Sequence, residues 1–409
     1  MSTTISRRAA LAAAAGATAL ALAACGGGAQ GDASSSEPIK VGTSLPLTGE
    51  FSQPGKAAQQ GYQVWEALTN EKGGLLGRKV QLVIKDDASN QNTIVADYNA
   101  LISRDKVDLL IGSYSSLLNL PASAVAERNQ MLFVEPAGGS PEMFNRKFKY
   151  LFFTQQATAD KQGEVFAKWV AALPADQRPK TAAYPTLDDP FVAPNVEGIR
   201  KILEPAGIKT VYKQTYAIDT KNFDTIASAV KAAQPDLLVH GANFEDGVGL
   251  TRAILKSGFK PELVYQTTAP SLGKQYSDAI GEANTEGVLY AVSHDPEAKT
   301  PGNEEFVKKY AEMFGGTPPE DAADGYAAGE VLAAAVKGVG RIDDQAKLAD
   351  WLRANPVDTV LGSLSWNADG SPKGQYLIGQ WQKGKIHMVL PEEFATAPIE
   401  PAWNPGGAS

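Results

Sequence analysis

The chain has 409 residues, and 46 Asp and Glu against 38 Lys and Arg give it a formal net charge of −8. This acidic balance excludes nucleic acid as a natural partner and argues against attachment to anionic lipid through charge alone. The only cysteine is Cys25, so an internal disulfide is excluded as well. The part of the chain from about residue 38 to 398 is too long for one ordinary hydrophobic core, and its length predicts two lobes.

Residues 1–24 have the pattern of a secretory signal peptide. The basic pair Arg7-Arg8 precedes an Ala- and Leu-rich run over residues 9–24 that is short for a membrane span. Cys25 follows Leu-Ala-Ala directly, which resembles the lipobox of bacterial lipoproteins, where the cysteine becomes the first residue and is lipidated. Residues 25–37 predict a flexible tether. Cleavage removes both arginines and would move the net charge from −8 to −10, and the arginine pair leaves Sec and twin-arginine export both open.

Short apolar runs then alternate with amphipathic stretches through the first part of the chain. The runs predict strands, and the stretches, with apolar residues three and four apart, predict helices. Strict alternation predicts a parallel sheet with helices on both faces. The predicted strands are 39–47, 80–84, 107–111 and 131–135, and the predicted helices are 55–71, 93–104 and 121–128.

The same alternation restarts near residue 181, which predicts a second α/β lobe. Its predicted strands are 181–184, 210–216, 236–240 and 263–266, and its predicted helices are 192–204, 223–233 and 244–257. A helical block follows at 306–313, 322–336 and 345–354, and then β-like segments at 360–366, 376–381 and 386–390. Residues 395–409, rich in Pro, Ala and Gly, predict a loose tail.

Motifs for enzyme chemistry are weak. Gly49 to Ala57 approaches a phosphate-binding loop, but the glycine spacing is one residue too long and Ala57 offers no hydroxyl for magnesium. No Gly-x-Ser-x-Gly elbow and no His-Glu-x-x-His pair is present, and His240, His294 and His387 are isolated from one another. Paired carboxylates such as Asp188-Asp189 are explained by turns and caps. We therefore expect no catalytic activity, no cofactor and no metal.

Two segments at predicted strand ends hold the residues with binding potential. Ile111 to Ser116, which includes Tyr114 and Ser115, leads into the helix near Pro121, and Glu135 to Pro141 follows the next strand. In open α/β sheets, ligands bind beyond the carboxyl ends of the strands, and free N–H groups with small hydroxyls form an anion site there. The composition alone leaves open whether these residues bind an anion or only make turns.

A resemblance to a known family favours binding. Leu47-Thr48-Gly49, Asn70-x-x-Gly73-Gly74, Lys85-Asp86-Asp87, Pro121-Ala122-Ser123 and Leu361-Gly362…Trp366 resemble, in order, segments of type I periplasmic binding proteins. The branch of leucine/isoleucine/valine receptors of ABC importers is the most similar, and the resemblance covers nearly the whole mature chain.

The resemblance implies a fold of two doubly wound parallel-sheet lobes joined by three crossovers, with the ligand held in the cleft between the lobes. We place the crossovers near residues 155, 288 and 366. Lobe 1 is then residues 38–155 plus 288–366, and lobe 2 is residues 156–287 plus 367–394.

The resemblance also implies site residues. Ser116 matches the serine that binds the ligand carboxylate, and Gly138 and Gly139 match positions that add backbone groups, although Gly139 lacks the usual threonine hydroxyl. We expect Ser116 and this glycine pair to face the opening between the lobes. Wall positions fall on Tyr114 with its neighbour Ser115, on Phe191, and on Phe51 or Pro54.

The ammonium end of the family's site is where this sequence departs most. The family uses a tyrosine and a glutamate of the second lobe, whereas this chain has Asn243 or Phe244 and Thr267 at those positions. An unpaired buried ammonium is costly. Either another carboxylate replaces the glutamate, or the ligand lacks an ammonium group, and of these we favour an apolar or aromatic carboxylate. The candidate replacements are Asp188, Asp189, Glu245, Asp246 and Asp321.

These patterns predict a lipid-anchored, extracytoplasmic solute-binding component of an ABC importer. It would be a monomer that captures a small carboxylate-bearing ligand (a branched-chain or apolar amino acid, or an aromatic or keto acid) by cleft closure and delivers it to a membrane permease. A sensory receptor of the same fold is the alternative. An exported hydrolase would need His240 or His294 beside a serine of the cleft.

Overall fold

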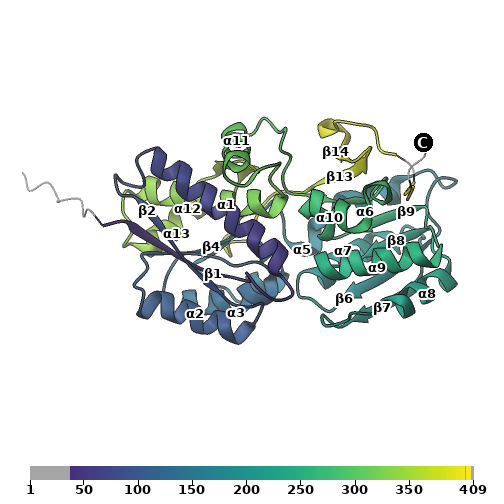
Figure 1. Cartoon of the computed structure of the whole chain (residues 1–409), viewed down its shortest axis with the longest axis horizontal. Helices are drawn as coiled ribbons and strands as arrows, with labels where there is room; N and C mark the ends of the chain where they lie inside the picture. Colours follow the sequence, from purple (N-terminus) through teal and green to yellow (C-terminus); the bar gives the residue numbers. More distant parts are fainter. Residues whose placement is uncertain (1–36, 401, 407–409) are drawn as a thin grey trace, which may run out of the picture. The chain divides into compact units, whose positions relative to one another are not determined.

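The computed structural model describes residues 37–400 and 402–406. The first sheet is built around β1 (Ile39–Leu45), whose buried apolar and small residues suit a central strand. It pairs in parallel with β2 (Val80–Asp86) on one side and β3 (Leu109–Ile111) on the other. β4 (Phe133–Glu135) and β5 (Leu151–Phe153) complete the all-parallel order β2-β1-β3-β4-β5 (Figure 1).

Helices cover both faces of this sheet, as the alternation predicts. One apolar core lies between the sheet and the helices α1, α12 and α13, and a second core lies on the opposite face under α2 and α3. The helices and the small ladder of this lobe are α1 (Ser52–Glu71), α2 (Gln91–Ser103), α3 (Ser116–Arg128), α4 (Pro141–Phe144), α11 (Asn303–Phe314), α12 (Glu320–Val339), α13 (Gln345–Ala354), β11 (Val357–Thr359) and β12 (Gly362–Leu364).

The α1 and α12 helices pack unusually closely because a glycine lies at their contact. A Cβ atom added at Gly61 of α1 would lie 1.9 Å from the carbonyl oxygen of Ala322 on α12. Any larger side chain at this position would therefore push the two helices apart. This packing holds the first two turns of α12, which carry Glu320, Asp321 and Asp324, against the first lobe.

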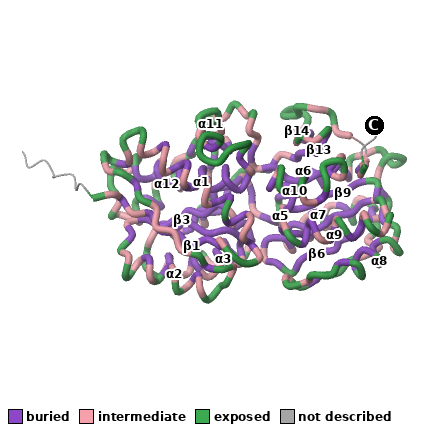
Figure 2. The backbone as a smooth tube through the Cα atoms, viewed as in Figure 1, coloured by how far each residue is buried: buried purple, intermediate pink, exposed green. Residues whose placement is uncertain are grey.

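The second sheet has the order β14-β13-β10-β9-β8-β6-β7, in which the strands from β7 to β10 are parallel and the β13–β14 hairpin is antiparallel. Apolar cores again lie on both faces. Figure 2 shows the buried backbone concentrated in the strands of both sheets. The strands are β6 (Thr181–Leu187), β7 (Lys209–Tyr216), β8 (Leu237–His240), β9 (Leu263–Gln266), β10 (Leu289–Val292), β13 (Leu377–Gln382) and β14 (Lys385–Leu390).

The helices that cover this second sheet include short 3₁₀ turns near its edge. They are α5 (Ala159–Gln162), α6 (Glu164–Ala172), α7 (Val192–Leu203), α8 (Asp224–Ala233), α9 (Phe244–Ser257), α10 (Lys274–Ile280), η1 (Ala269–Leu272), η2 (Glu282–Asn284) and η3 (Glu392–Phe394).

Three segments of the described chain run between the two halves, at residues 154–158, 293–302 and 365–376. Hydrogen bonds join these crossovers to one another. The Gln156 side chain donates to the carbonyl of Ser293 at 2.8 Å, and the N–H of Gly374 donates to the carbonyl of Gln156 at 2.8 Å. The connection between the lobes is therefore one hydrogen-bonded bundle of segments.

The structure differs from the sequence prediction at one lobe boundary. Residues 288–292 were expected in lobe 1, but β10 is a central strand of the second sheet, between β9 and β13. Val288, Tyr290 and Val292 are buried in one core of that lobe. The second crossover therefore begins at Ser293, about five residues later than the sequence pattern places it.

Two predicted elements also start or end elsewhere. The helix expected from Pro121 begins at Ser116, with Pro121 inside it. Proline has no N–H to give to the carbonyl four residues earlier, and that carbonyl, of Leu117, accepts a hydrogen bond from the Gln91 side chain at 2.9 Å instead. The strand expected over 360–366 is interrupted by a turn, so that β11 and β12 form a short hairpin.

The prediction of a loose tail is wrong for the described residues beyond 395. Trp403 is only 1% exposed and packs into a core of the second lobe. Its N–H donates to the carbonyl of Glu262 at 2.8 Å, and its indole donates to the carbonyl of Asn284 at 3.0 Å. The Pro, Ala and Gly content indicated a loose tail, but the large apolar side chain of Trp403 anchors the segment.

The signal peptide, Cys25 and most of the tether lie outside the described residues. Among the helices within 37–400 and 402–406, none combines the length and apolar character that a bilayer crossing requires.

Candidate functional site

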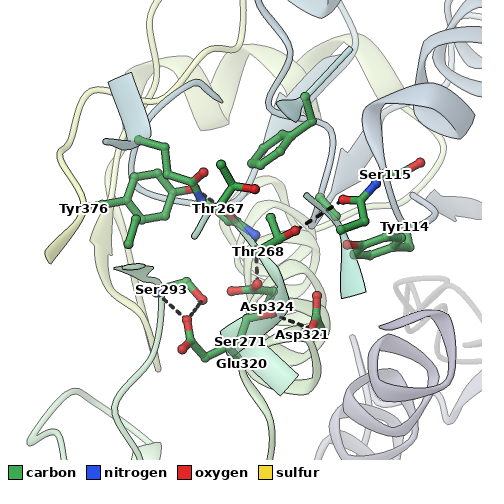
Figure 3. Close-up of a pocket in the computed structure, with 16 residues that line it drawn as sticks. Tyr114, Ser115, Thr267, Thr268, Ser271, Ser293, Glu320, Asp321, Asp324 and Tyr376 are labelled. Atoms are coloured by element: carbon green, nitrogen blue, oxygen red, sulfur yellow. Dashed lines mark hydrogen bonds between the residues drawn. The ribbon is translucent and has the colours of Figure 1, made fainter. Parts of the chain in front are cut away.

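A buried cavity lies where the carboxyl ends of the two sheets meet. About 500 Å³ of space not filled by atoms lies here, part of it open to solvent. Its lining comes from loops after β3, β4, β6, β8 and β9, from all three crossovers and from α12. The lining residues are Tyr114, Ser115, Ala137, Gln155, Gln162, Phe191, Asn243, Thr267, Thr268, Ser271, Ala291, Ser293, Glu320, Asp321, Asp324 and Tyr376 (Figure 3).

Six of the residues named from the sequence meet in this cavity: Tyr114, Ser115, Phe191, Asn243, Thr267 and Asp321. The first five lie on loops that follow β3, β6, β8 and β9, and β3 and β8 each lie beside a position where the strand order reverses. Such switch points are where open α/β sheets bind ligands. The rule about strand ends thus brings these five residues to one cavity, and their role in binding stays a prediction.

Ser115 has an unusual conformation at the start of α3. Its φ of +72° and ψ of 148° lie in a region that residues other than glycine rarely occupy. Its side chain is 5% exposed, and its hydroxyl has no hydrogen-bond partner among the described residues. A strained backbone that holds an unpaired hydroxyl at a cavity wall is typical of a binding position.

Ser116, which the sequence favours as the carboxylate ligand, lies outside the lining. It is fully buried in the first lobe, and its hydroxyl accepts a hydrogen bond from the N–H of Ser140 at 3.0 Å. The expectation that this hydroxyl faces the opening therefore disagrees with the structure. Ser116 instead ties the start of α3 to the loop after β4, while the neighbouring Ser115 faces the cavity.

Gly138 and Gly139 also lie behind the lining. The N–H of Gly138 donates to the buried carboxylate of Glu135, and burial raises the pKa of that carboxylate to about 8. A Cβ at Gly139 would lie 2.8 Å from the ring of Phe191, so glycine is required there by the close approach of a cavity residue. Ala137, from the same loop, reaches the cavity.

Phe51, predicted as a wall residue, and Phe244, predicted with Asn243 as an alternative at the ammonium end, do not line the cavity. Phe51 is buried against the ring of Tyr114, with 5.9 Å between ring centroids, and supports that wall from behind. Phe244 is the first residue of α9 and is partly buried against the second-lobe core. Of the two residues at that position, Asn243 is the one in the cavity, and its side-chain nitrogen has no partner in the described residues.

The acidic side of the cavity comes from the first turns of α12. Glu320 accepts hydrogen bonds from the hydroxyl of Tyr290 at 2.6 Å and from the N–H of Ser293 at 2.7 Å. Asp321 accepts from the hydroxyl of Ser271 at 3.2 Å. Asp324 accepts from the Gln155 amide at 2.8 Å through Oδ2, and its Oδ1 has no partner among the residues described (Figure 3).

Burial shifts these three acids strongly. It raises the pKa of Glu320 to about 8 and that of Asp321 to about 7. The pKa of Asp324 is raised well above its ordinary value by burial first and then by the charges of Asp321 and Glu320. No arginine, lysine or histidine is present in the lining to offset them.

The other carboxylates considered from the sequence are occupied elsewhere and do not line the cavity. Asp189 accepts from the N–H groups of Phe191 at 2.8 Å and Val192 at 3.1 Å, at the start of α7. Asp246 accepts from the Tyr216 hydroxyl at 2.5 Å and from the N–H of Asn243 at 3.0 Å. Asp188 and Glu245 are also absent from the lining.

Sequence reasoning missed Glu320, Asp324 and Gln155. Glu320, Asp321 and Asp324 follow Pro318-Pro319, and their spacing puts them on adjoining turns at the start of a helix. That pattern was available but is shared by many helix starts, where acids are favoured by the helix dipole. Gln155 had no local signal, because its partners lie far away in the chain.

The hydrolase alternative lacks its pair of residues. His240 bonds to Tyr216 at 3.1 Å and to Gln266 at 2.8 Å inside the second lobe, and neither it nor His294 lines the cavity. Among the residues that the structure describes, no cluster of three or more potential metal ligands occurs. A cavity between two doubly wound sheets, lined from both and holding unpaired polar atoms, defines a solute-binding protein.

Comparison with known proteins gives the family. Residues 38–385 match the family model described as periplasmic binding protein. A curated relative, an amino acid binding protein of Pseudomonas aeruginosa, is 26% identical over 354 residues, which cover 86% of this chain and 92% of the relative.

Two solved structures share the fold. The leucine-binding protein LivK of Thermotoga maritima has a TM-score of 0.77 at 21% identity, covering 87% of this chain and 99% of LivK. An ABC-transporter solute-binding protein of Rhodopseudomonas palustris in complex with benzoate has a TM-score of 0.77 at 19% identity, covering 91% of this chain and all of that protein. The chain belongs to the periplasmic binding protein family, with the type I two-lobe fold, and is a non-enzymatic solute-binding protein.

Proposed function

We propose that this protein is the extracytoplasmic receptor of an ABC importer and that it captures a small carboxylate-bearing solute of the amino-acid class in the cavity between its lobes. The similarity to an amino acid binding protein and to a leucine-binding protein supports this class. The observation that carries the proposal is the set of three unpaired polar atoms in one buried cavity.

These three atoms are Ser115 Oγ, Asn243 Nδ2 and Asp324 Oδ1, and each belongs to a side chain that is no more than 7% exposed. Leaving such a group unpaired costs about 1–3 kcal/mol. Two of the atoms can donate a hydrogen bond and the third can only accept one when its carboxyl is ionised. An amino acid offers acceptors at its carboxylate and donors at its ammonium, so it satisfies both kinds of atom at once.

The carboxylate of the ligand would lie at the start of α3. Ser115 precedes this 13-residue helix, whose N-terminal end favours an anion through its free N–H groups and its dipole. The role that the sequence gives to the Ser116 hydroxyl thus passes to Ser115. The walls would be Tyr114 from the first lobe and Phe191 from the second.

Binding by closure of the two lobes is supported by contacts that cross between them inside the cavity. Asp321 of α12 receives its hydrogen bond from Ser271 of the second lobe, and Glu320 receives bonds from Tyr290 and Ser293. Hinge bending at crossovers is the usual motion of such two-lobe proteins. We expect the ligand to add further contacts of the same kind.

A thermal-shift screen followed by calorimetry tests the function. The purified protein would be screened against the common amino acids, their keto acids, aromatic acids and amides. The expected result is a raised melting midpoint and measurable binding for at least one amino acid. In a second assay, the protein together with its permease should drive uptake of that amino acid. Absence of binding across the whole panel would reject the proposal.

We also propose that Cys25 anchors the mature protein to the outer side of the cell membrane as a monomer. Its sequence context supports this anchoring. Replacing Cys25 with alanine should move the protein from the membrane fraction to the soluble exported fraction, while ligand binding is unchanged. Recovery of the C25A variant in the membrane fraction would contradict the anchor.

A further inference from the structure

The acidic cavity wall indicates more about the ligand than its class. Three carboxyl groups from α12 line the cavity, and no basic residue does. One carboxyl is enough to pair with the α-ammonium of an amino acid. The remaining carboxyl oxygens can accept hydrogen bonds from an additional positive group.

The three acids differ in how many hydrogen bonds their carboxyl oxygens accept. Glu320 accepts three hydrogen bonds, from the Tyr290 hydroxyl and from the N–H and hydroxyl of Ser293, and so functions as a contact between the lobes. Asp324 is 5% exposed and has one oxygen without a partner. Asp321, 8% exposed, receives a single long bond of 3.2 Å from Ser271.

Asp321 and Asp324 are three residues apart on α12, so their side chains lie on one face, with Cβ atoms about 5–6 Å apart. Both line the same cavity (Figure 3). Together they form a pair of neighbouring carboxyl groups that can bind two ammonium groups of one molecule, or one guanidinium group. A neutral side chain such as that of leucine offers these carboxyls no donor and no counter-charge, so the free oxygen of Asp324 stays unpaired.

We propose that the ligand is a cationic amino acid, whose positive groups outnumber its carboxylates, and that Asp321 and Asp324 bind those positive groups. This inference rests on the proposed function and specifies its substrate. It also moves the ammonium-binding acid from the second lobe to the first. The keto acids and aromatic acids considered from the sequence are thereby excluded as ligands.

Protonation follows from this arrangement. In the empty cavity, burial holds a large share of these carboxyls in the neutral form near pH 7. A bound cation favours the ionised form, so binding should release protons and tighten as the pH rises from 6 to 8. The titratable groups near these carboxyls are Glu320 and the phenols of Tyr114 and Tyr376. Asp189 and Asp246, which do not line the cavity, also act on Tyr114.

The experiment is isothermal titration calorimetry of the exported full-length protein with matched probes. Lysine, ornithine, arginine and putrescine are compared with leucine and with the keto acid of leucine, each in two buffers of different ionisation enthalpy at pH 7. The expected result is binding of at least one cationic probe at least about 10-fold tighter than leucine, with net proton release. The keto acid should show no binding.

Three variants assign the interaction. D321N and D324N should each lower the affinity for the cationic probe about 10-fold or more. D321N should also reduce the ratio of that affinity to the affinity for leucine. The matched control is E330Q, which removes an acid from the same helix outside the cavity, where Glu330 accepts from the N–H of Val360 at 2.9 Å. E330Q should bind as the wild type does. The thermal midpoint of each empty variant confirms that it is folded.

The outcomes separate the two proposals. Tight binding of leucine with weak or no binding of cationic probes would overturn the cationic ligand but leave the amino-acid receptor intact. Equal binding of leucine and lysine, unchanged in D321N and D324N, would do the same. No binding of any amino acid, amine or acid would instead remove the proposed function itself.

Discussion

Ser115 combines two costly features in a single residue. Its backbone has a conformation suited to glycine, and its buried hydroxyl has no partner among the described residues. Backbone strain of this kind costs on the order of 1–3 kcal/mol. Glycine would suit the stability of the fold better at this position, which favours the proposal that Ser115 binds the ligand.

We therefore expect S115G to be more stable and to bind less. Glycine relieves the strain, so the free energy of unfolding should rise by roughly 1 kcal/mol, while the loss of the hydroxyl should weaken ligand binding about 10-fold. Chemical denaturation of the empty protein and calorimetry measure the two effects.

The control is S116A. It removes the acceptor for the Ser140 N–H, so we expect a loss of stability of about 1–3 kcal/mol and a smaller effect on affinity once the protein is folded. If S116A instead abolished binding with unchanged stability while S115G had no effect on affinity, Ser116 would be the carboxylate ligand after all.

At the residue scale, sequence reasoning located loops that line the cavity but not always the residue in each that reaches it. The rule about strand ends predicted the segment 111–116, and six residues named from the sequence line the cavity. Which of Ser115 and Ser116 faces the cavity depends on one φ angle and on contacts with the next loop, such as the bond from the Ser140 N–H to the Ser116 hydroxyl and that from the Asn119 amide to Glu135. No local pattern specifies such an angle.

Among the elements, α12 links stability to binding. Its first turns supply three acids to the cavity, while its length packs against α1 in the first-lobe core. An acid whose pKa is raised on folding binds protons more tightly in the native state than in the unfolded state. The free energy of unfolding then falls as the pH rises between the two pKa values.

For Asp321 this window runs from near 4 to about 7. We expect the empty protein to lose stability as the pH rises through this range, and D321N to flatten the dependence by up to about 1.4 kcal/mol per pH unit. Denaturant titrations at pH 5, 6 and 7 measure the slopes. The exposed-site variant E297Q should keep the wild-type slope, and a wild-type slope in D321N would contradict the burial of an uncharged Asp321.

The contact between α1 and α12 provides a second prediction at this scale. In an isolated helix, replacing glycine with alanine stabilises by about 1 kcal/mol. G61A should do the opposite here, because its Cβ would lie 1.9 Å from the Ala322 carbonyl, and we expect destabilisation of at least about 2 kcal/mol with weakened ligand binding. Thermal denaturation tests this, with K56A on the exposed side of α1 as the control that should change little.

Across the whole molecule, Gln155 connects the hinge to the cavity. Its side-chain nitrogen donates to the carbonyl of Pro136 at 2.7 Å and to Asp324 at 2.8 Å, and its oxygen accepts from the Tyr376 hydroxyl of the third crossover. One side chain therefore joins two crossovers, the loop after β4 and the acidic wall.

We expect Q155A to fold but to bind its ligand about 10-fold more weakly, because Asp324 loses the bond that positions it and the crossovers lose a shared contact. Small-angle scattering with and without ligand should show a smaller compaction on binding than in the wild type. Unchanged affinity and unchanged compaction would show that Gln155 has no part in closure.

The large-scale fold was predictable because it depends on periodicity, which is local. Alternating strands and helices gave two parallel sheets, and the family resemblance supplied the crossovers. The sheet that β10 joins and the burial of Trp403 were not predictable in this way. β10 could continue either sheet until its partners were known, and Trp403 is buried only because Glu262 and Asn284 lie beside it.

The burial of Trp403 has a practical consequence for following how the protein unfolds. The six tryptophans divide evenly: Trp65, Trp351 and Trp366 pack with the first-lobe core, and Trp169, Trp381 and Trp403 with the cores of the second lobe. Variants that retain only one of these sets would give each half its own fluorescence signal. Coincident melting of the two signals would identify a single cooperative unit, and separate melting would show that one half unfolds while the other is still folded.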